Sequence, residues 1–252
     1  MNPAHPPNRS SSQLQISGAI VLNASHSTYV WDGIWGGDIY SLPLERKQRA
    51  AKRAAALQLF ENIGTHESVL DIGCGSADLL SILFDSRDKN GGMLVGLERS
   101  GTALDLAAKR NGDSDVYLVS GDATKLPFGD DSFDNVLLFG VMEHISDSHV
   151  VLSEARRVLR SSGRVFITSS NAMSALQLKN FALDRVGRYR YGYQKNWTRK
   201  SLVRLVEQFF DVEEQFVLQC DADMPLVLAI DSLIGKIFSG WGRYICIRAK
   251  RC

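Results

Sequence analysis

Several features are scarce or missing in this chain of 252 residues, and each absence excludes a class of protein. The four cysteines, at positions 74, 220, 246 and 252, form no C-x-x-C pair and join no histidine cluster, so we expect no metal site. Their number and spacing favour reduced thiols in a cytoplasmic protein over a disulfide framework. A net charge of +1 provides no general attraction to nucleic acid or to an anionic membrane.

Long apolar runs are missing too. Residues 1–16 contain proline, serine and asparagine but no secretory apolar segment, and they predict a disordered tail. The longest apolar stretch, residues 225–238, is interrupted by Asp231 and Lys236 and is too short to span a bilayer. We interpret it as an amphipathic helix packed on the core, in preference to a membrane or dimer contact.

The most informative segment is the one from Val69 to Leu80. An apolar run that contains Asp71 leads into Gly73-Cys74-Gly75 and then into a helical pattern. This order is typical of a strand that turns tightly into a helix beneath a ligand, where only glycine lets the backbone turn and approach closely. Asp78 stands where a dinucleotide site has its third glycine, and its carboxylate would oppose a pyrophosphate at the helix N-terminus. The segment therefore predicts a phosphate-free nucleoside, for which the cationic S-adenosylmethionine qualifies.

Strand and helix patterns alternate along the rest of the chain. Strands are expected at 69–72, 93–97, 116–119, 133–139 and 163–169, with a closing pair at 212–218 and 244–249; helices are expected at 41–62, 78–84, 101–109, 148–159 and 198–209, the last capped by Thr198. This order predicts an α/β, doubly wound, mostly parallel seven-stranded Rossmann-like sheet with a C-terminal antiparallel strand. Residues 17–61 would form an N-terminal helical lid, and residues 62–252 the main domain with a substrate-covering insertion at 171–197.

Acidic residues stand at the ends of the first three expected strands. Glu98 lies 23 residues beyond Gly75, a spacing at which a carboxylate can accept from both ribose hydroxyls, although a solvated glutamate is the alternative. Asp122 could accept from the amino group of adenine, or it could make an Asx turn. Asp71 suits a cationic amine. Arg99 could stack on adenine or face solvent.

Five segments together resemble the class I S-adenosylmethionine-dependent methyltransferases. They are residues 69–75, 96–100, 121–134, 142–145 and 158–168, and the similarity covers about 62–170, closest to the branch that methylates small molecules such as quinones, sterols and glycine derivatives. The resemblance implies that S-adenosylmethionine is the cofactor. It further implies that Asp71, Gly73 and Gly75 hold its methionine end, Glu98 the ribose, Asp122 and Ala123 the adenine, and the Phe139 backbone the amino acid portion.

Two segments rich in aromatic residues fall outside this similarity. Residues 34–40 resemble the N-terminal lid of glycine and sarcosine N-methyltransferases, but Tyr40 and the two residues after it depart from the expected His-x-Gly. We expect Tyr40, Tyr191 and Tyr193 to contact the acceptor. Six Lys and Arg residues surround the second set of tyrosines and could contact nucleic acid, but a loop that shapes a small-molecule pocket is the preferred interpretation.

His144 follows the fourth strand closely and is the candidate general base. A structural role stays open, because a Glu-His pair is common in this branch whatever the substrate. The sequence lacks the Asn/Asp-Pro-Pro-Tyr/Phe and Pro-Cys motifs of nucleobase methylation, and the match of Tyr191 and Lys195 to a dehydrogenase pattern is interpreted as coincidence.

The prediction is therefore methyl transfer from S-adenosylmethionine to an oxygen or nitrogen atom of a small-molecule acceptor, without metal or nucleic acid. A relative that binds the cofactor without methylating, as a cyclase or scaffold, is the alternative, and an RNA or protein methyltransferase is less favoured. The acceptor and a homodimer are left open.

Overall fold

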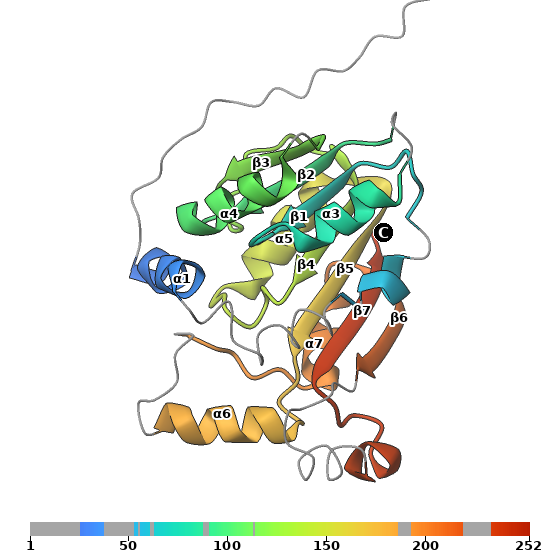
Figure 1. Cartoon of the computed structure of the whole chain (residues 1–252). Coiled ribbons are helices and arrows are strands. Elements are labelled where there is room, and N and C mark those ends of the chain that lie inside the picture. Colours follow the sequence, from blue (N-terminus) through green and yellow to red (C-terminus); the bar gives the residue numbers. More distant parts are fainter. Residues whose placement is uncertain are drawn as a thin grey trace, which may run out of the picture.

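The structure is a computed structural model that describes residues 26–37, 53–54, 56–60, 63–87, 91–112, 114–185, 193–218 and 233–252 (Figure 1). The labelled elements are α1 (His26–Gly36), β1 (Val69–Ile72), α3 (Asp78–Asp85), β2 (Leu94–Glu98), α4 (Gly101–Asn111), β3 (Val116–Ser120), β4 (Phe133–Phe139), α5 (Ser148–Val158), β5 (Leu159–Ser170), α6 (Ala175–Arg185), α7 (Arg199–Val206), β6 (Asp211–Leu218) and β7 (Tyr244–Lys250). Residues 56–60 and 233–237 are also helical. The predicted tail 1–16 lies outside the described residues.

All seven strands belong to one sheet, in the order β3-β2-β1-β4-β5-β7-β6. Strands β1 to β5 pair in parallel, whereas β7 runs antiparallel to both β5 and β6. The predicted doubly wound sheet with its antiparallel C-terminal strand is therefore confirmed. The five parallel strands end at one edge, which is where such sheets bind ligands.

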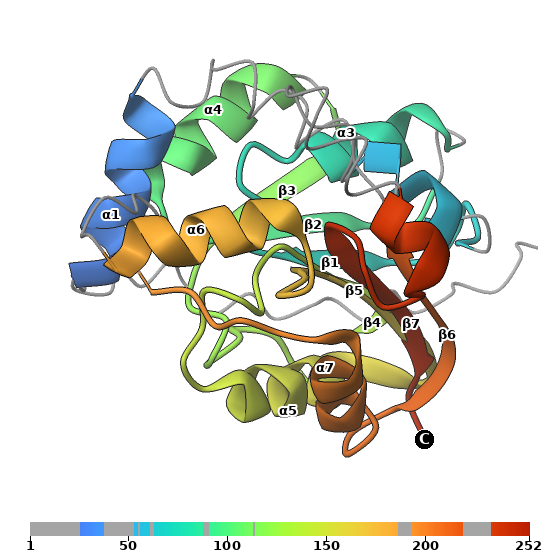
Figure 2. The same ribbon diagram turned by 90° about the horizontal axis from the view of Figure 1, so that it is seen from below.

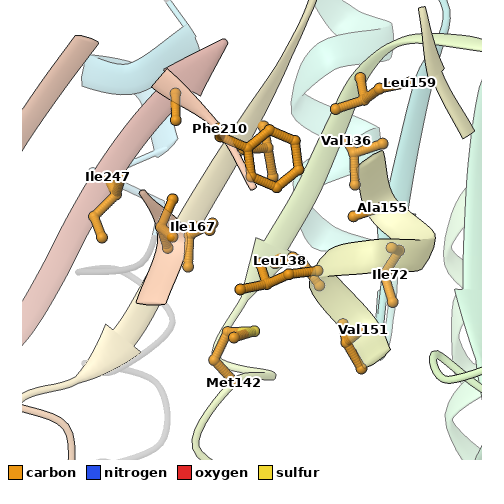
Figure 3. Packing of buried hydrophobic residues seen from close by; sticks show 14 of the residues in the cluster. Ile72, Val136, Leu138, Met142, Val151, Ala155, Leu159, Ile167, Phe210 and Ile247 are labelled. Atoms are coloured by element: carbon orange, nitrogen blue, oxygen red, sulfur yellow. The ribbon is translucent and has the colours of Figure 1, made fainter. Parts of the chain in front are cut away.

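Helices cover both faces of the sheet (Figure 2). On one face, α5 and α7 pack on the strands, and Figure 3 shows Val151 and Ala155 of α5 against Ile72, Val136 and Leu138. On the other face, a second cluster joins residues 56–60, α3 and α4 to the strands. Burial of both faces explains why β1, β2 and β4 are apolar almost throughout.

The structure differs from the predicted elements in three places. Strand β5 begins at Leu159, where a helix was expected, because Leu159 is already extended and pairs with Phe133. Helix α1 lies within the expected helical lid 17–61, but the helix there was expected at 41–62, of which only 53–54 and 56–60 are described, and no helix was expected where α6 lies. The expected helix at 225–238 is described only from Leu233 onward, and there Leu233, Ile237 and Phe238 are exposed, so core packing is a wrong prediction for this part.

The N-terminus of α7 follows its sequence signal. Thr198 accepts a hydrogen bond from the Ser201 backbone N–H at 3.2 Å, and the Ser201 hydroxyl accepts one from the Thr198 N–H at 2.9 Å. This reciprocal cap confirms the predicted start of the helix. None of the described helices is long and apolar enough to cross a membrane.

Candidate functional site

A cavity of about 970 Å³ lies at the edge where the parallel strands end. It brings together most of the residues predicted for the site: Asp71, Gly73, Gly75, Glu98, Arg99, Asp122, Ala123, Phe139, His144 and Tyr193. Tyr40 and Tyr191 lie outside the described residues. Cavities of this size hold ligands as large as a nucleoside cofactor. Within the described part of the chain, no three His, Cys, Asp or Glu side chains are placed to hold a metal ion.

The glycine turn after β1 has the conformation that its sequence predicts. Gly73 and Gly75 have φ angles of 72° and 55°, in the left-handed region that favours glycine. A Cβ atom at Gly73 would lie 2.6 Å from Val141, and one at Gly75 would lie 2.6 Å from Trp35. The Gly73 N–H donates to the Leu97 carbonyl at 2.7 Å, which ties the turn to β2. Both glycines are therefore required by conformation and by close contacts.

Asp78 is the first residue of α3, so its carboxylate lies at the helix N-terminus. It forms an ion pair with Arg110 of α4, and both residues line the cavity. A carboxylate at this end stabilises the helix dipole. Its position at the start of α3 agrees with the expectation that no pyrophosphate binds here.

Glu98, the last residue of β2, is held by backbone N–H groups from two directions. One carboxylate oxygen accepts from Gly75 at 3.0 Å, and the other accepts from Arg99 at 2.7 Å and Ser100 at 2.9 Å. Burial raises the pKa of the Glu98 carboxyl, and the hydrogen bonds offset only part of that rise. The contact with Gly75 joins the predicted ribose ligand to the glycine turn.

Asp122 makes the Asx turn that was weighed as the alternative to a binding role. One of its oxygens accepts from the Thr124 N–H at 2.9 Å and from the Thr124 hydroxyl at 2.8 Å. The other oxygen is 3.6 Å from the Arg99 guanidinium. Burial alone would raise the pKa of Asp122. The Thr124 hydrogen bonds and Arg99 together lower it by more than burial raises it, so the pKa is below its usual value. Asp122 is thus a carboxylate at the cavity wall.

Asp71 and Phe139 come from adjacent strands and border the middle of the cavity. Asp71 is buried on β1. Phe139 ends β4, and its ring packs on Phe60 with centroids 5.6 Å apart. The next residue, Gly140, turns with a φ of 71° and leads the chain toward His144.

His144 lines the cavity from the loop after β4. Its Nδ1 is 3.3 Å from the Tyr193 backbone carbonyl, so the peptide group of Tyr193, rather than its phenol, contacts the imidazole. The preceding Glu143 is buried, and its carboxylate accepts from the Ser169 hydroxyl at 2.9 Å and the Ser170 hydroxyl at 3.0 Å. These bonds fix the loop that carries His144 to the end of β5.

Helix α1 borders the cavity and lies within residues 17–61, the segment that was expected to form a helical lid. Trp31 and Trp35, one turn apart, both line the cavity. Trp31 meets the His144 ring edge to face, while Trp35 lies against Gly75. Between them, Asp32 accepts a hydrogen bond from the Ser100 hydroxyl at 2.5 Å. The helix therefore bridges the cofactor side and the His144 side.

Helix α6 supplies another wall of the cavity and lies within residues 171–197, the segment that was expected to cover the substrate. Leu176, Gln177 and Asn180 of α6 line the cavity. Gln177 is buried, donates to the Asn196 side chain at 2.6 Å and accepts from Asn180 at 3.4 Å. The three residues that line the cavity are spaced by one and three positions, which fits a helix. No stripe of apolar residues at helical spacing strengthened that signal in the sequence. This side of the cavity therefore offers amide groups.

Comparisons with known proteins agree with the site. A profile of the methyltransferase domain matches residues 70–167. The chain is 35% identical over 157 residues to demethylmenaquinone methyltransferase of Mycolicibacterium paratuberculosis, covering 60% of this chain and 63% of that protein. The Bacillus velezensis enzyme of the same name is 36% identical over 107 residues, covering 41% and 46%. The matches thus span less than two thirds of the length of these curated relatives.

Solved structures share the fold. A methyltransferase dependent on S-adenosylmethionine from Thermotoga maritima has a TM-score of 0.65 at 19% identity, covering 90% of this chain and 100% of that one. The 4+2 cyclase SpnF has a TM-score of 0.58 at 17% identity, covering 81% and 82%. The sequence profile, the relatives and the fold agree with the resemblance that the motifs predicted: residues 70–167 belong to the methyltransferase domain, and the sheet has the class I methyltransferase fold.

Proposed function

We propose that this protein transfers the methyl group of S-adenosylmethionine to an oxygen or nitrogen atom of a small-molecule acceptor. The observation that carries the proposal is one cavity that is lined both by acids at successive strand ends and by His144. The relatives named for demethylmenaquinone support an acceptor that is a small molecule.

The residues on the glycine-turn side fit this cofactor. Asp71 is a buried carboxylate for a cationic amine, and Glu98 can accept from the ribose hydroxyls. Asp122 and the Ala123 backbone would meet the adenine edge, with Arg99 beside them. When bound, S-adenosylmethionine supplies an activated methyl group and a thioether leaving group. The chain therefore has mainly to orient the two reactants and exclude water.

His144 is assigned the role of general base toward the acceptor. The Tyr193 carbonyl can only accept a hydrogen bond, so a bond to it at 3.3 Å requires the proton on Nδ1. The Nε2 atom then carries the lone pair and can take the proton that an acceptor hydroxyl or amine loses as its new bond to the methyl carbon forms. The Trp31 edge limits rotation of the imidazole.

The acceptor side of the cavity is polar. Gln177, Asn180 and Arg243 line it, together with Ser174 and Tyr244. These groups suit an acceptor that carries hydroxyl or carbonyl oxygens near the methylated atom. Carbon is the competing acceptor atom. The position of the label in the product, read by NMR, separates oxygen, nitrogen and carbon.

The domain roles follow the same division. Residues 17–61 would act as a lid through α1, and residues 171–197 would cover the acceptor through α6. Residues 62–252 would hold the cofactor and the catalytic groups. Tyr40 and Tyr191 stay candidates for acceptor contact, alongside Tyr193.

Incubation with methyl-labelled S-adenosylmethionine and fractionated small-molecule extracts tests the proposal. We expect S-adenosylhomocysteine and a labelled small molecule to form in equal amounts, and we expect less of both with Glu98→Ala at cofactor concentrations near the wild-type Kd. Cofactor binding without S-adenosylhomocysteine in every fraction would favour the cyclase or scaffold alternative, since the fold is shared with SpnF. Label in RNA or protein would contradict the small-molecule proposal.

A further inference from the structure

Six of the eleven large apolar side chains exposed on the described surface come from two short stretches of the chain. We call these six the apolar rim: Met173, Leu178, Phe181, Leu233, Ile237 and Phe238. Leu178, Ile237 and Phe238 are 57%, 69% and 58% exposed. Soluble monomers scatter such residues, whereas a gathered set marks a contact surface.

The two stretches adjoin each other. The Met173 carbonyl accepts from the Gly242 N–H at 3.0 Å, and its sulfur borders Gly240. The Asn171 amide donates to the carbonyls of Gly240 at 2.9 Å and Gly242 at 2.7 Å. Both figures place α6 and the C-terminal helix at the same end of the molecule, where the strands β1 to β5 end (Figures 1 and 2). The rim is therefore one surface.

Helix α6 has two different faces, and one of them belongs to the rim. Gln177 and Asn180 line the cavity, whereas Leu178 and Phe181 point outward. Tyr193 both lines the cavity and is exposed, so the cavity reaches the surface at Tyr193. Whatever covers the outward side of α6 lies on a helix whose other side is a wall of this cavity.

Positive charge accompanies the rim. The Arg185 guanidinium lies over the Phe181 ring at 4.7 Å, and Lys236 is exposed between Leu233 and Ile237 in the helix at 233–237. Two described cations therefore lie beside exposed apolar groups of the rim, although the whole chain has a net charge of only +1.

We propose that the apolar rim docks on an anionic lipid bilayer, with its apolar side chains among the headgroups and its cations on the lipid phosphates. Apolar residues bordered by Lys and Arg are the pattern of interfacial membrane binding, and each cation near such a surface adds about 1 kcal/mol. A second copy is a poorer occupant, because a two-fold contact would bring cations against cations. Nucleic acid is also poorer, because four of the six rim side chains are aliphatic and offer no ring for bases to stack on.

Docking in this orientation turns the cavity opening toward the lipid interface. The inference concerns binding alone and holds whether or not the proposed methyl transfer is correct. It also accounts for exposed apolar residues in the segment 233–238, where packing on the core was predicted.

Vesicle flotation tests the proposal with the full chain. Wild-type protein should float with phosphatidylcholine vesicles that contain phosphatidylglycerol, and binding should weaken in high salt. The pairs Leu178→Ser with Phe181→Ser, and Ile237→Ser with Phe238→Ser, should each reduce partitioning about tenfold or more, because each removes two apolar groups from the lipid. The control pair Leu57→Ser with Val150→Ser, exposed outside the rim, should leave it unchanged.

Circular dichroism and thermal melting would confirm that all variants fold, since every substituted side chain is exposed. Absence of wild-type flotation with anionic vesicles would overturn the proposal, as would equal losses in the rim and control pairs. Equal binding to pure phosphatidylcholine would overturn the role of the cations. Dimerisation by light scattering or an RNA mobility shift, either one abolished by the rim pairs and without flotation, would replace the lipid with that partner.

Discussion

Trp31 meets His144 edge to face, with ring centroids 4.7 Å apart and an angle of 79° between the planes. The contact joins the lid helix to the side chain assigned as general base. Four residues later, Trp35 lies against Gly75 on the cofactor side. Helix α1 therefore contacts both halves of the cavity, so a ligand bound in either half should change how well ordered α1 is.

His144→Gln should lower kcat about a hundredfold or more while leaving the Kd for S-adenosylmethionine unchanged. Glutamine keeps a polar side chain but cannot take up the proton that the acceptor loses, so the loss should fall on kcat. His149→Gln, an exposed histidine on α5, is the matched control. An unchanged kcat would assign His144 a structural role only.

Asp32→Ala should loosen the lid without unfolding the domain. It removes the hydrogen bond from the Ser100 hydroxyl but leaves the Ser100 cap on Ala103 in place. Amide hydrogen exchange in α1 should accelerate about tenfold, the equivalent of one charge-assisted bond, with little change in Tm. Asp105→Ala, exposed on α4, should leave exchange in α1 as it is. Identical exchange in both variants would mean that the hydrogen bond between Asp32 and Ser100 does not hold α1.

Gly75→Ala should destabilise the protein and weaken cofactor binding. The new Cβ would sit at a φ of 55° and within 2.6 Å of Trp35, so the turn or the lid has to shift. We expect a loss of about 1–3 kcal/mol in urea unfolding. Gly101→Ala meets no atom within 4 Å at the start of α4 and should be neutral or slightly stabilising. Equal stability of the two variants would contradict the strain assigned to Gly75.

Glu154→Gln should cost stability in a way that depends on pH. Hydrogen bonds from Arg157 lower the pKa of Glu154 most, burial opposes this, and a bond from the Leu126 N–H adds to the lowering. A carboxyl whose pKa is lower in the folded state than in the unfolded state stabilises the fold at pH values above its unfolded-state pKa. That stability is lost as the pH falls through the folded-state pKa. Urea titrations should show a deficit of about 1–3 kcal/mol at neutral pH that shrinks in acid. A deficit independent of pH would contradict this origin; Glu207→Gln is the exposed control.

The sheet could be predicted because its signals are local. Apolar runs that end in Asp71, Glu98 or a glycine mark strands buried on both faces, and parallel crossovers then bring their ends to one edge. That rule is enough to predict which strand-end residues the cavity brings together. It does not predict their roles: Asp122, for example, makes an Asx turn at the cavity wall.

The positions of helices α1 and α6 could not be predicted from the sequence, for a physical reason. Helix α1 has Gly33 and several aromatic and β-branched residues, which are weak helix formers, and its tryptophans face a cavity rather than a core. Helix α6 carries polar residues toward the cavity and Leu178 and Phe181 toward solvent, the reverse of an ordinary amphipathic helix. Function, rather than core packing, decides both patterns.

Calorimetric titration with S-adenosylmethionine tests the central claim most directly. Wild-type protein should bind one equivalent, and Glu98→Ala should lose about 1–3 kcal/mol of binding free energy, because the carboxylate that is meant to accept from the ribose hydroxyls is gone. Glu207→Ala should bind as the wild type does. Absence of binding to the wild type, or equal affinity in Glu98→Ala, would contradict the assignment of this cavity to the cofactor.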